Sequence, residues 1–254
     1  MEKLLLSEIA HCLNAECPEE KVITEISTDT RNLPAGCLFI AIKGERFDGH
    51  AFIKQAIENG AAAAVSEYPV DGCPCIVVKN TRTALLKLAK YYRSKFNPIL
   101  VGITGSVGKT TTKEMIALVL SEKYKTLKTQ GNLNNEIGLP KTLFNLDSSY
   151  QAAVIEMGMS DFGEIERLSN TAVPTIGVIT NIGFSHIENL KSQEGILKAK
   201  LEILSGMKSD APLIVNGDDR YLAPLKEEFK SSRSVYLYGI GDKCAVSYTH
   251  LRAH

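Results

Sequence analysis

One segment, Gly102-Ile-Thr-Gly-Ser-Val-Gly-Lys-Thr-Thr-Thr112, constrains the fold of this 254-residue chain more than any other. The apolar run at 99–103 that leads into it predicts a buried strand, and Met115, Leu118 and Val119 follow at helical spacing. A strand, a glycine loop, a Lys-Thr pair and a helix in this order are typical of a phosphate-binding loop. Its glycines allow a tight turn, so that backbone N–H groups converge on a phosphate at the helix N-terminus. We therefore expect an α/β domain that binds a nucleotide.

The loop departs from the generic phosphate-loop pattern by one residue. That pattern requires a glycine five residues before Gly108, where this chain has Ile103, and the glycine stands one position earlier at Gly102. The alternative is an ordinary glycine turn with Lys109 as a solvated residue, but Gly-Lys-Thr at a helix start after an apolar strand favours the phosphate loop. Lys109 would then reach a β- or γ-phosphate, and the Thr110 hydroxyl would bind Mg²⁺.

Length and composition favour an ordinary globular protein of one large domain or two smaller ones, with 44% hydrophobic and 23% charged residues. Lys+Arg and Asp+Glu both count 29, and a net charge of zero argues against broad nucleic-acid binding. The N-terminal apolar run is too short for a signal peptide, and none is long enough to span a membrane, so we expect a cytoplasmic location without membrane insertion. The six cysteines lack metal-ligand spacing, and we expect reduced thiols.

The pattern of the chain indicates two α/β domains joined near Asn97-Pro98, where a helix is broken. In domain 1–97 we expect helices at 4–13, 51–59 and 81–96 and strands at 22–27, 37–42, 62–65 and 75–78. In domain 98–245 we expect strands at 99–104, 152–156, 175–180, 213–216 and 235–238, with helices between them. This alternation predicts a small α/β domain followed by a phosphate-loop domain with a mostly parallel sheet, which we expect to be incomplete.

The last residues, 246–254, have an unusual sequence, Val-Ser-Tyr-Thr-His-Leu-Arg-Ala-His. They resemble the translated read-through of a sequencing adapter, and the alternative is a genuine polar tail. We expect a non-native, poorly ordered tail in which nothing after Cys244 forms a strand or helix that covers the sheet.

Three expected strands of the second domain carry chemical groups at or beyond their ends. The first leads into the phosphate loop, the second ends at Glu156, and His186 lies a few residues after the third. In open α/β sheets ligands bind at the carboxyl ends of the strands. Alone, Glu156 reads as a solvated strand-end acid and His186 as a loop histidine, but together with the phosphate loop they suit a Mg²⁺–nucleotide site.

Two other segments are candidates for binding. Gly131-Asn-Leu-Asn-Asn-Glu-Ile-Gly138 suits a shaped loop rich in hydrogen-bonding groups, or an ordinary turn before a helix at Leu139-Pro140. In the first domain Arg31 and Arg46 flank an expected strand, a geometry that suits a diphosphate or carboxylate, although charges near turns are usually only solvated.

Several motifs occur together in a fixed order, and their combination is more specific than the loop alone. They are Ser27-Thr-Asp-Thr-Arg31, Gly44-Glu-Arg-Phe-Asp-Gly-His50, Thr104-Gly-Ser-Val-Gly-Lys-Thr110, Gly131–Gly138, Val154-Ile-Glu-Met-Gly158, Asn181-Ile…His186 and Lys198-Ala-Lys200. From about residue 4 to about residue 244 the chain resembles the Mur ligases of peptidoglycan synthesis, whose central domain carries the same shifted phosphate loop. The resemblance is closest to the branch that adds D-alanyl-D-alanine to UDP-N-acetylmuramoyl-tripeptide.

The resemblance implies an ATP-dependent carbon–nitrogen ligase that works through an acyl phosphate, with roles at matching positions. ATP would be bound by Thr104, Gly105, Ser106, Val107, Gly108, Lys109, Thr110 and Asn135. Mg²⁺ would be held by Thr110, Glu156 and His186, and the substrates would be bound by Thr30, Arg31, Arg46 and Asn132. Lys109 and Lys200 would be catalytic, with Lys200 carbamylated by CO₂, whereas the alternative for Lys200 is a surface residue on a helix at 194–204.

The resemblance also implies a third, C-terminal domain that contacts ATP and the incoming amine, and this chain does not include it. We therefore expect a fragment that binds parts of its substrates but does not catalyse ligation, and we expect a monomer. Three alternatives stay open: the sister ligase that adds the third amino acid (diaminopimelate or lysine), a ligase fused to another enzyme, and a non-catalytic nucleotide-binding module.

Overall fold

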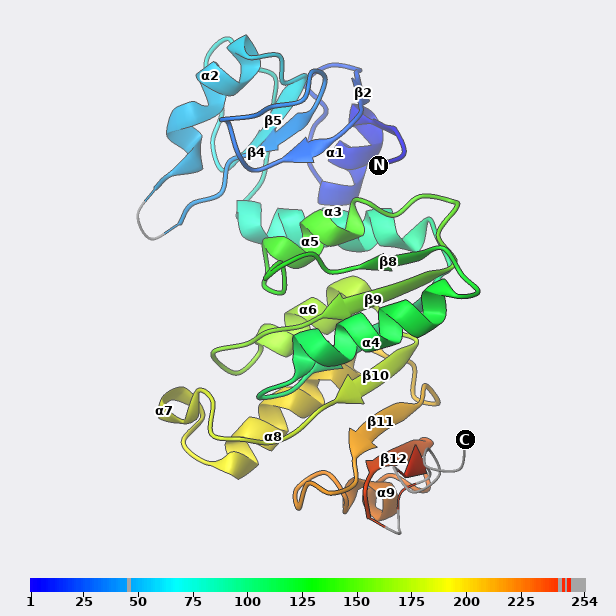
Figure 1. Cartoon of the computed structure of the whole chain (residues 1–254). Coiled ribbons are helices and arrows are strands. Elements are labelled where there is room, and N and C mark those ends of the chain that lie inside the picture. Colours follow the sequence, from blue (N-terminus) through cyan, green and yellow to red (C-terminus); the bar gives the residue numbers. More distant parts are fainter. Residues whose placement is uncertain (45–46, 242–243, 245, 248–254) are drawn as a thin grey trace. The chain divides into compact units, whose positions relative to one another are not determined.

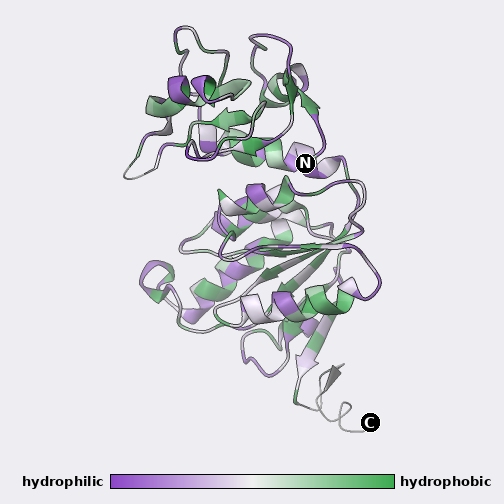
Figure 2. Cartoon of the chain, turned by 45° about the horizontal axis from the view of Figure 1, so that its top comes forward, coloured by the Kyte–Doolittle hydropathy of each residue, from purple (hydrophilic) through white to green (hydrophobic). Residues whose placement is uncertain are grey.

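The computed structural model describes residues 1–44, 47–241, 244 and 246–247 (Figure 1). Contacts divide the chain into two compact units, and each is described by itself. The first contains Met1–Phe96 with the short segment Leu143–Asp147, and the second contains the remaining residues from Asn97 onward. In both units the hydrophobic residues are concentrated in the strands (Figure 2). Among the described residues, none of the helices combines the length and the hydrophobicity of a membrane span.

The first unit is built on a parallel sheet whose described strands follow the order β3-β4-β5-β6. A separate antiparallel pair, β1 and β2, lies outside this sheet. The strands are β1 (Leu4–Leu5), β2 (Val22–Ile23), β3 (Ile26–Ser27), β4 (Leu38–Ile40), β5 (Ala63–Ser66) and β6 (Cys75–Val77). The helices are α1 (Leu6–Leu13), the 3-10 turn η1 (Gly49–Phe52), α2 (Ile53–Glu58) and α3 (Thr81–Ser94).

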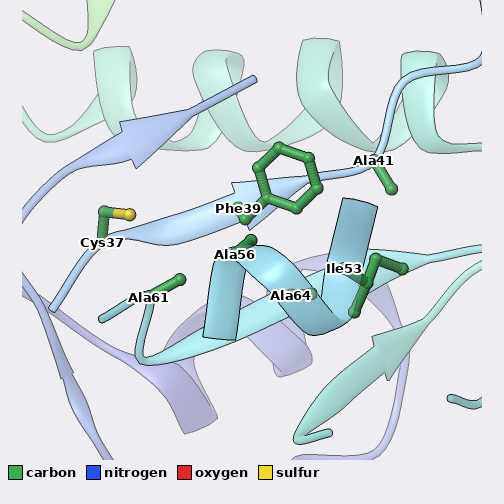
Figure 3. Packing of buried hydrophobic residues seen from close by; sticks show 7 residues of the cluster. All are labelled: Cys37, Phe39, Ala41, Ile53, Ala56, Ala61 and Ala64. Atoms are coloured by element: carbon green, nitrogen blue, oxygen red, sulfur yellow. The ribbon is translucent and has the colours of Figure 1, made fainter. Parts of the chain in front are cut away.

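The sequence of α3 explains both where the helix starts and which face of it is buried. The side chain of Asn80 accepts a hydrogen bond from the backbone N–H of Thr83 at 2.8 Å, which caps the helix start. Leu85, Leu88 and Tyr92 recur at helical spacing and are fully buried, as the pattern predicted. A cluster of buried hydrophobic residues lies between α2 and the sheet, where side chains of α2, β4 and β5 meet (Figure 3).

The second unit contains a parallel sheet that has seven strands over the described residues, in the order β13-β12-β11-β10-β7-β9-β8. The strands are β7 (Ile99–Thr104), β8 (Thr126–Lys128), β9 (Ala152–Glu156), β10 (Ile176–Ile179), β11 (Leu213–Asn216), β12 (Val235–Gly239) and β13 (Val246–Ser247). The helices are α4 (Lys109–Ser121), α5 (Gly138–Leu143), α6 (Glu164–Ala172), α7 (Ile187–Leu190), α8 (Gln193–Leu201), η2 (Glu202–Gly206) and α9 (Leu225–Glu228). Every strand pair in this sheet is parallel, so the carboxyl ends lie along one edge.

Helices cover both faces of this sheet: α4 lies on one face and α6 on the other (Figure 1). The strand order explains the arrangement, because the connection from β7 to β8 runs toward one end of the sheet and that from β9 to β10 toward the other. Right-handed crossovers in opposite directions place their helices on opposite faces. Strands covered on both sides are continuous apolar runs, as β7 and β9 are.

The expected fold class, a small N-terminal α/β unit followed by a phosphate-loop unit with a parallel sheet, is confirmed. Some elements differ. The expected strand at 22–27 is two strands, β2 and β3, in different sheets, and the expected helix at 4–13 begins only at Leu6, after β1. The expected helix at 194–204 changes into the 3-10 turn η2 after Leu201. Strand β8 was not expected, because its three residues between polar neighbours give no apolar run.

Helix α4 and the chain end complete the comparison. The expected helix is confirmed as α4; Met115, Leu118 and Val119 on it are 64%, 68% and 71% exposed, and the helix buries Lys113 and Ala117. We expected no strand after Cys244, yet β13 pairs in parallel with β12. The rest of the unusual tail, 248–254, lies outside the described residues, so the expected disorder there stays a prediction.

Candidate functional site

The phosphate loop and Glu156 meet at the carboxyl edge of the second sheet, because β7 and β9 are paired neighbours that both end there. The register places Ile103 opposite Glu156, so the loop that follows β7 starts beside the carboxylate that closes β9. Strand β10 pairs with β7 on the other side, with Ile179 opposite Thr104. The ends of three strands thus lie side by side at one edge of the sheet.

The two glycines of the loop serve different geometric needs. Gly108 has a φ of 78° and forms the N-cap of α4, a left-handed conformation that glycine adopts without strain. Gly105 has a φ of 153°, and a Cβ there would lie 1.9 Å from the Thr180 hydroxyl. The loop therefore packs against the end of β10 so closely that a side chain at Gly105 does not fit.

Lys109 is turned back onto this loop at the first position of α4. Its ammonium donates to the Gly105 carbonyl at 2.9 Å. Burial lowers the pKa of Lys109, and the negative charge of Glu156 opposes this effect. A cation held at the start of a helix, inside a glycine loop, is placed to meet a phosphate.

Glu156 is the central buried acid of the site, with 2% of its surface exposed. Its two carboxylate oxygens have separate partners. The Thr110 hydroxyl donates to one at 3.0 Å, and the Asn134 side-chain amide donates to the other at 2.9 Å. A buried carboxylate beside a hydroxyl forms a set of oxygen donors of the kind that Mg²⁺ prefers.

Asn181, which follows β10, holds the middle of the phosphate loop. Its side-chain oxygen accepts hydrogen bonds from the backbone N–H groups of Ser106 and Val107, at 3.1 Å and 3.0 Å. The Ser106 hydroxyl in turn accepts from the Gly183 N–H at 2.9 Å. Two N–H groups expected to meet a phosphate are therefore bonded to Asn181 in this structure.

Two buried polar groups near the loop differ in character. The Thr104 hydroxyl is the one buried side-chain nitrogen or oxygen atom among the described residues that has no hydrogen-bond partner.

The second group is Lys200 on α8. It is 2% exposed, so the alternative of a surface lysine is wrong. Burial, with a further contribution from the charge of Lys109, lowers the pKa of Lys200 to about 7. A large fraction of this amine is neutral near pH 7, and only the neutral amine is nucleophilic.

Three other predicted site residues, His186, Asn135 and Asn132, are exposed rather than buried beside Glu156. His186 is an exposed N-cap of α7 with a left-handed φ of 63°. Within the described ranges, no group of three or more His, Cys, Asp or Glu side chains is arranged to hold a metal ion. Asn135 uses its side-chain oxygen to accept from the N–H groups of Ile137 and Gly138, at the start of α5, and Asn132 is exposed.

In the first unit, Arg31 forms an ion pair with Asp29 in the turn after β3, and 88% of its side chain is exposed. Thr30 lies between them and is half-buried. Arg46 lies outside the described residues, so its expected role stays a prediction. His50 is buried close by in sequence, with Nδ1 2.6 Å from Asp48 and Nε2 accepting from the Glu67 N–H.

Asn134 and Asn181 were not predicted as site residues. Both lie in candidate segments of the sequence, the asparagine-rich loop and the Asn-Ile stretch before His186. The predicted residues of that loop were Asn132 and Asn135, whereas the structure turns Asn134 toward Glu156. Neighbouring asparagines look alike in a sequence, because only the backbone course decides which side chain faces the site.

Known protein families and solved structures match the sequence and the fold of this chain. Residues 103–254 match the Mur ligase middle domain, and residues 22–93 match the Mur ligase family catalytic domain. MurF from Acinetobacter baumannii superposes with a TM-score of 0.88 at 35% identity, over 95% of this chain and 54% of that chain. The MurF ligase from Thermotoga maritima in complex with ADP gives a TM-score of 0.78 at 35% identity, over 85% of this chain and 50% of that chain.

A curated relative points the same way. The UDP-N-acetylmuramoyl-tripeptide–D-alanyl-D-alanine ligase of Bacillus subtilis is 50% identical over 208 residues, which are 80% of this chain and 46% of that enzyme. The corresponding enzyme of Escherichia coli is 42% identical over 221 residues, which are 86% of this chain and 49% of that enzyme. The chain thus spans about half the length of the curated relatives it matches. With a middle-domain match over more than half of its residues, the chain belongs to the Mur ligase family.

Proposed function

We propose that the chain is part of an ATP-dependent ligase that adds D-alanyl-D-alanine to UDP-N-acetylmuramoyl-tripeptide in peptidoglycan precursor synthesis. The observation that carries the proposal is the hydrogen bond from the exposed Thr110 hydroxyl to the buried Glu156 carboxylate beside the Lys109 loop, in a chain 50% identical to an enzyme of that name. The likeness to a MurF ligase crystallised with ADP supports nucleotide binding by this chain. We propose residues 1–97 as the domain for the UDP end of the substrate and 98–245 as the ATP domain.

The site residues fit a magnesium ion. Mg²⁺ is commonly held by one or two carboxylates, with water and substrate phosphates completing its coordination, and the Glu156 carboxylate and Thr110 hydroxyl supply two such oxygens. When bound, the ion offsets the charge of the transferring phosphoryl group. His186 would have to approach from the loop before α7, where its side chain is exposed.

The chain's own groups have defined tasks in the proposed reaction. The α4 N-terminus and Lys109 bind and orient the ATP phosphates, and Asn181 keeps the loop in shape. The carboxylate of the peptide attacks the γ-phosphorus, which gives an acyl phosphate and ADP. The amine of the dipeptide then displaces phosphate and forms the amide bond. Positioning and charge stabilisation account for most catalysis in such phosphoryl transfers.

Lys200 suits carbamylation, because its amine is partly neutral at pH 7 and it is buried near the cation Lys109. The neutral amine attacks CO₂, loses a proton and becomes an anionic carbamate. That negative charge would relieve the repulsion between the two lysines. With ¹³C-labelled bicarbonate, the chain should show a carbamate carbon signal in its NMR spectrum, and Lys200→Met should abolish it.

Calorimetric titration with ADP and Mg²⁺ tests the nucleotide site directly. Lys109→Ala should weaken binding strongly, because the loop loses its cation, whereas Lys123→Ala changes an exposed lysine just after α4 and should have no effect. Circular dichroism confirms that both variants fold. Equal affinities of the two folded variants would contradict the phosphate-loop assignment.

The choice of substrate separates the alternatives. The proposed ligase should bind UDP-N-acetylmuramoyl-tripeptide more tightly than the corresponding dipeptide, whereas the sister ligase that adds the third amino acid should prefer the dipeptide. A nucleotide-binding module should bind neither. We also propose that the 254 residues alone do not form the amide bond, and ADP release that depends on tripeptide and D-alanyl-D-alanine would refute this.

A further inference from the structure

Among the described residues of the second unit, Lys113 is the most deeply buried lysine; it is one turn beyond Lys109 on α4 and takes no part in the chemistry described above. It is 1% exposed. Its ammonium donates to the backbone carbonyl of Thr129 at 2.8 Å and lies 3.1 Å from a carboxylate oxygen of Glu114. Removing an ammonium from water is costly, so a buried lysine with specific partners calls for a reason beyond packing.

Thr129 connects Lys113 to Glu156 at the carboxyl edge of the second sheet. It follows β8 directly and is fully buried. Its backbone N–H donates to the Val154 carbonyl at 3.1 Å, which continues the pairing with β9. Its hydroxyl accepts a hydrogen bond from the backbone N–H of Glu156 at 3.0 Å. Thr129 is therefore fixed from one side by Lys113 and itself fixes the main chain where β9 ends.

The Glu156 side chain is held at its carboxylate by Thr110 and Asn134. Bonding to β7 continues at the next residue, where the Met157 N–H donates to the Ile103 carbonyl at 2.8 Å. The Glu156 N–H is instead bonded to the Thr129 hydroxyl, so without that hydroxyl it would lose its partner and the backbone from which the carboxylate projects would be held less firmly. Groups one shell removed from a metal ligand set that ligand's orientation and the affinity of the site.

We propose that Lys113 is a positioning residue, which acts through Thr129 to hold Glu156 in place for the Mg²⁺ of the nucleotide. This inference rests on the proposed function, and it predicts a specific failure. Loss of Lys113 should weaken the contribution of Mg²⁺ to nucleotide binding, while the phosphate contacts of the loop remain. A lysine that only stabilised the fold would weaken binding with and without the metal alike.

The test uses the 254-residue chain and compares its affinity for ADP in Mg²⁺ with that in EDTA. For Lys113→Met we expect the ratio of the two affinities to fall about tenfold, in the range known for groups behind metal ligands. The affinity in EDTA should stay unchanged. Lys123→Met, an exposed lysine beyond the helix, is the matched control and should keep the full ratio.

A second pair of variants covers the case in which Lys113→Met does not fold. Thr129→Val removes the hydroxyl at nearly constant volume and should lower the same ratio, whereas Thr129→Ser retains the hydroxyl and should restore it. An undiminished ratio in the folded variants would overturn the positioning role while leaving the nucleotide site intact. Failure of both Lys113→Met and Thr129→Val to fold would also count against it, because the two residues would then serve the fold. If the unmodified chain bound no ADP, the proposed function would fail first.

Discussion

Lys200 provides the sharpest quantitative prediction, because its burial ties the stability of the fold to pH. Its pKa is lowered from 10.5 to about 7 in the folded chain. At about 1.4 kcal/mol per pKa unit, this change lowers the free energy of unfolding by about 5 kcal/mol at a pH low enough for the buried amine to be protonated. At pH values between the pKa of the folded chain and that of the unfolded chain, the unfolded chain binds more protons, so the free energy of unfolding rises with pH.

Lys200→Met removes this ionisation and keeps an unbranched side chain. From ionisation alone, the variant should exceed the parent in stability by about 5 kcal/mol near pH 6.5, but by only about 2 kcal/mol near pH 9. Packing differences add a constant to both values, so the change of about 3 kcal/mol between them is the diagnostic quantity. The stability difference thus shrinks as pH rises toward the pKa of the unfolded chain.

Urea unfolding at the two pH values, in buffers free of CO₂ to exclude carbamylation, measures this change. Lys198→Met provides the matched control, since Lys198 lies on the same helix but is exposed. Its effect should be equal at both pH values. A pH-independent difference between parent and Lys200→Met would show that the amine is charged in the folded chain, and the explanation of its reactivity would fail with it.

Three further substitutions test separate parts of the structure. Gly105→Ala should destabilise the chain by about 2 kcal/mol in urea unfolding and abolish ADP binding, because the new Cβ would lie 1.9 Å from the Thr180 hydroxyl; normal binding would show that the loop is looser than described. Thr104→Val removes a buried hydroxyl without a partner and should stabilise the chain by about 1 kcal/mol, so a loss of stability would reveal a missed hydrogen bond. Tyr92→Phe should cost about 1–2 kcal/mol, because its hydroxyl donates to the buried carbonyl of Leu146 at 2.6 Å, and a neutral result in thermal unfolding would argue against that bond.

The sequence by itself determined the features that depend on residues close together in the chain. The order strand, glycine loop, Lys109-Thr110, helix predicted the phosphate loop, because its parts are neighbours whose geometry is local. The face of α3 was predicted for the same reason, since Leu85, Leu88 and Tyr92 follow one another at helical spacing and are all buried. Alternation of strands and helices predicted the parallel sheet.

Only the tertiary structure decided which of these residues are buried and which side chains meet. The helical spacing of Met115, Leu118 and Val119 did not tell which face of α4 is buried, and in this structure that face carries Lys113 and Ala117. The family resemblance singled out Lys200, but the residues alone left a surface lysine as the alternative, and Asn134 looked like its neighbour Asn135. Their environments are set by strands distant in sequence, because β7, β9 and β10 are brought side by side by crossovers. Burial and partner choice are properties of that packing, and burial is the main cause that lowers the pKa of Lys200 to about 7.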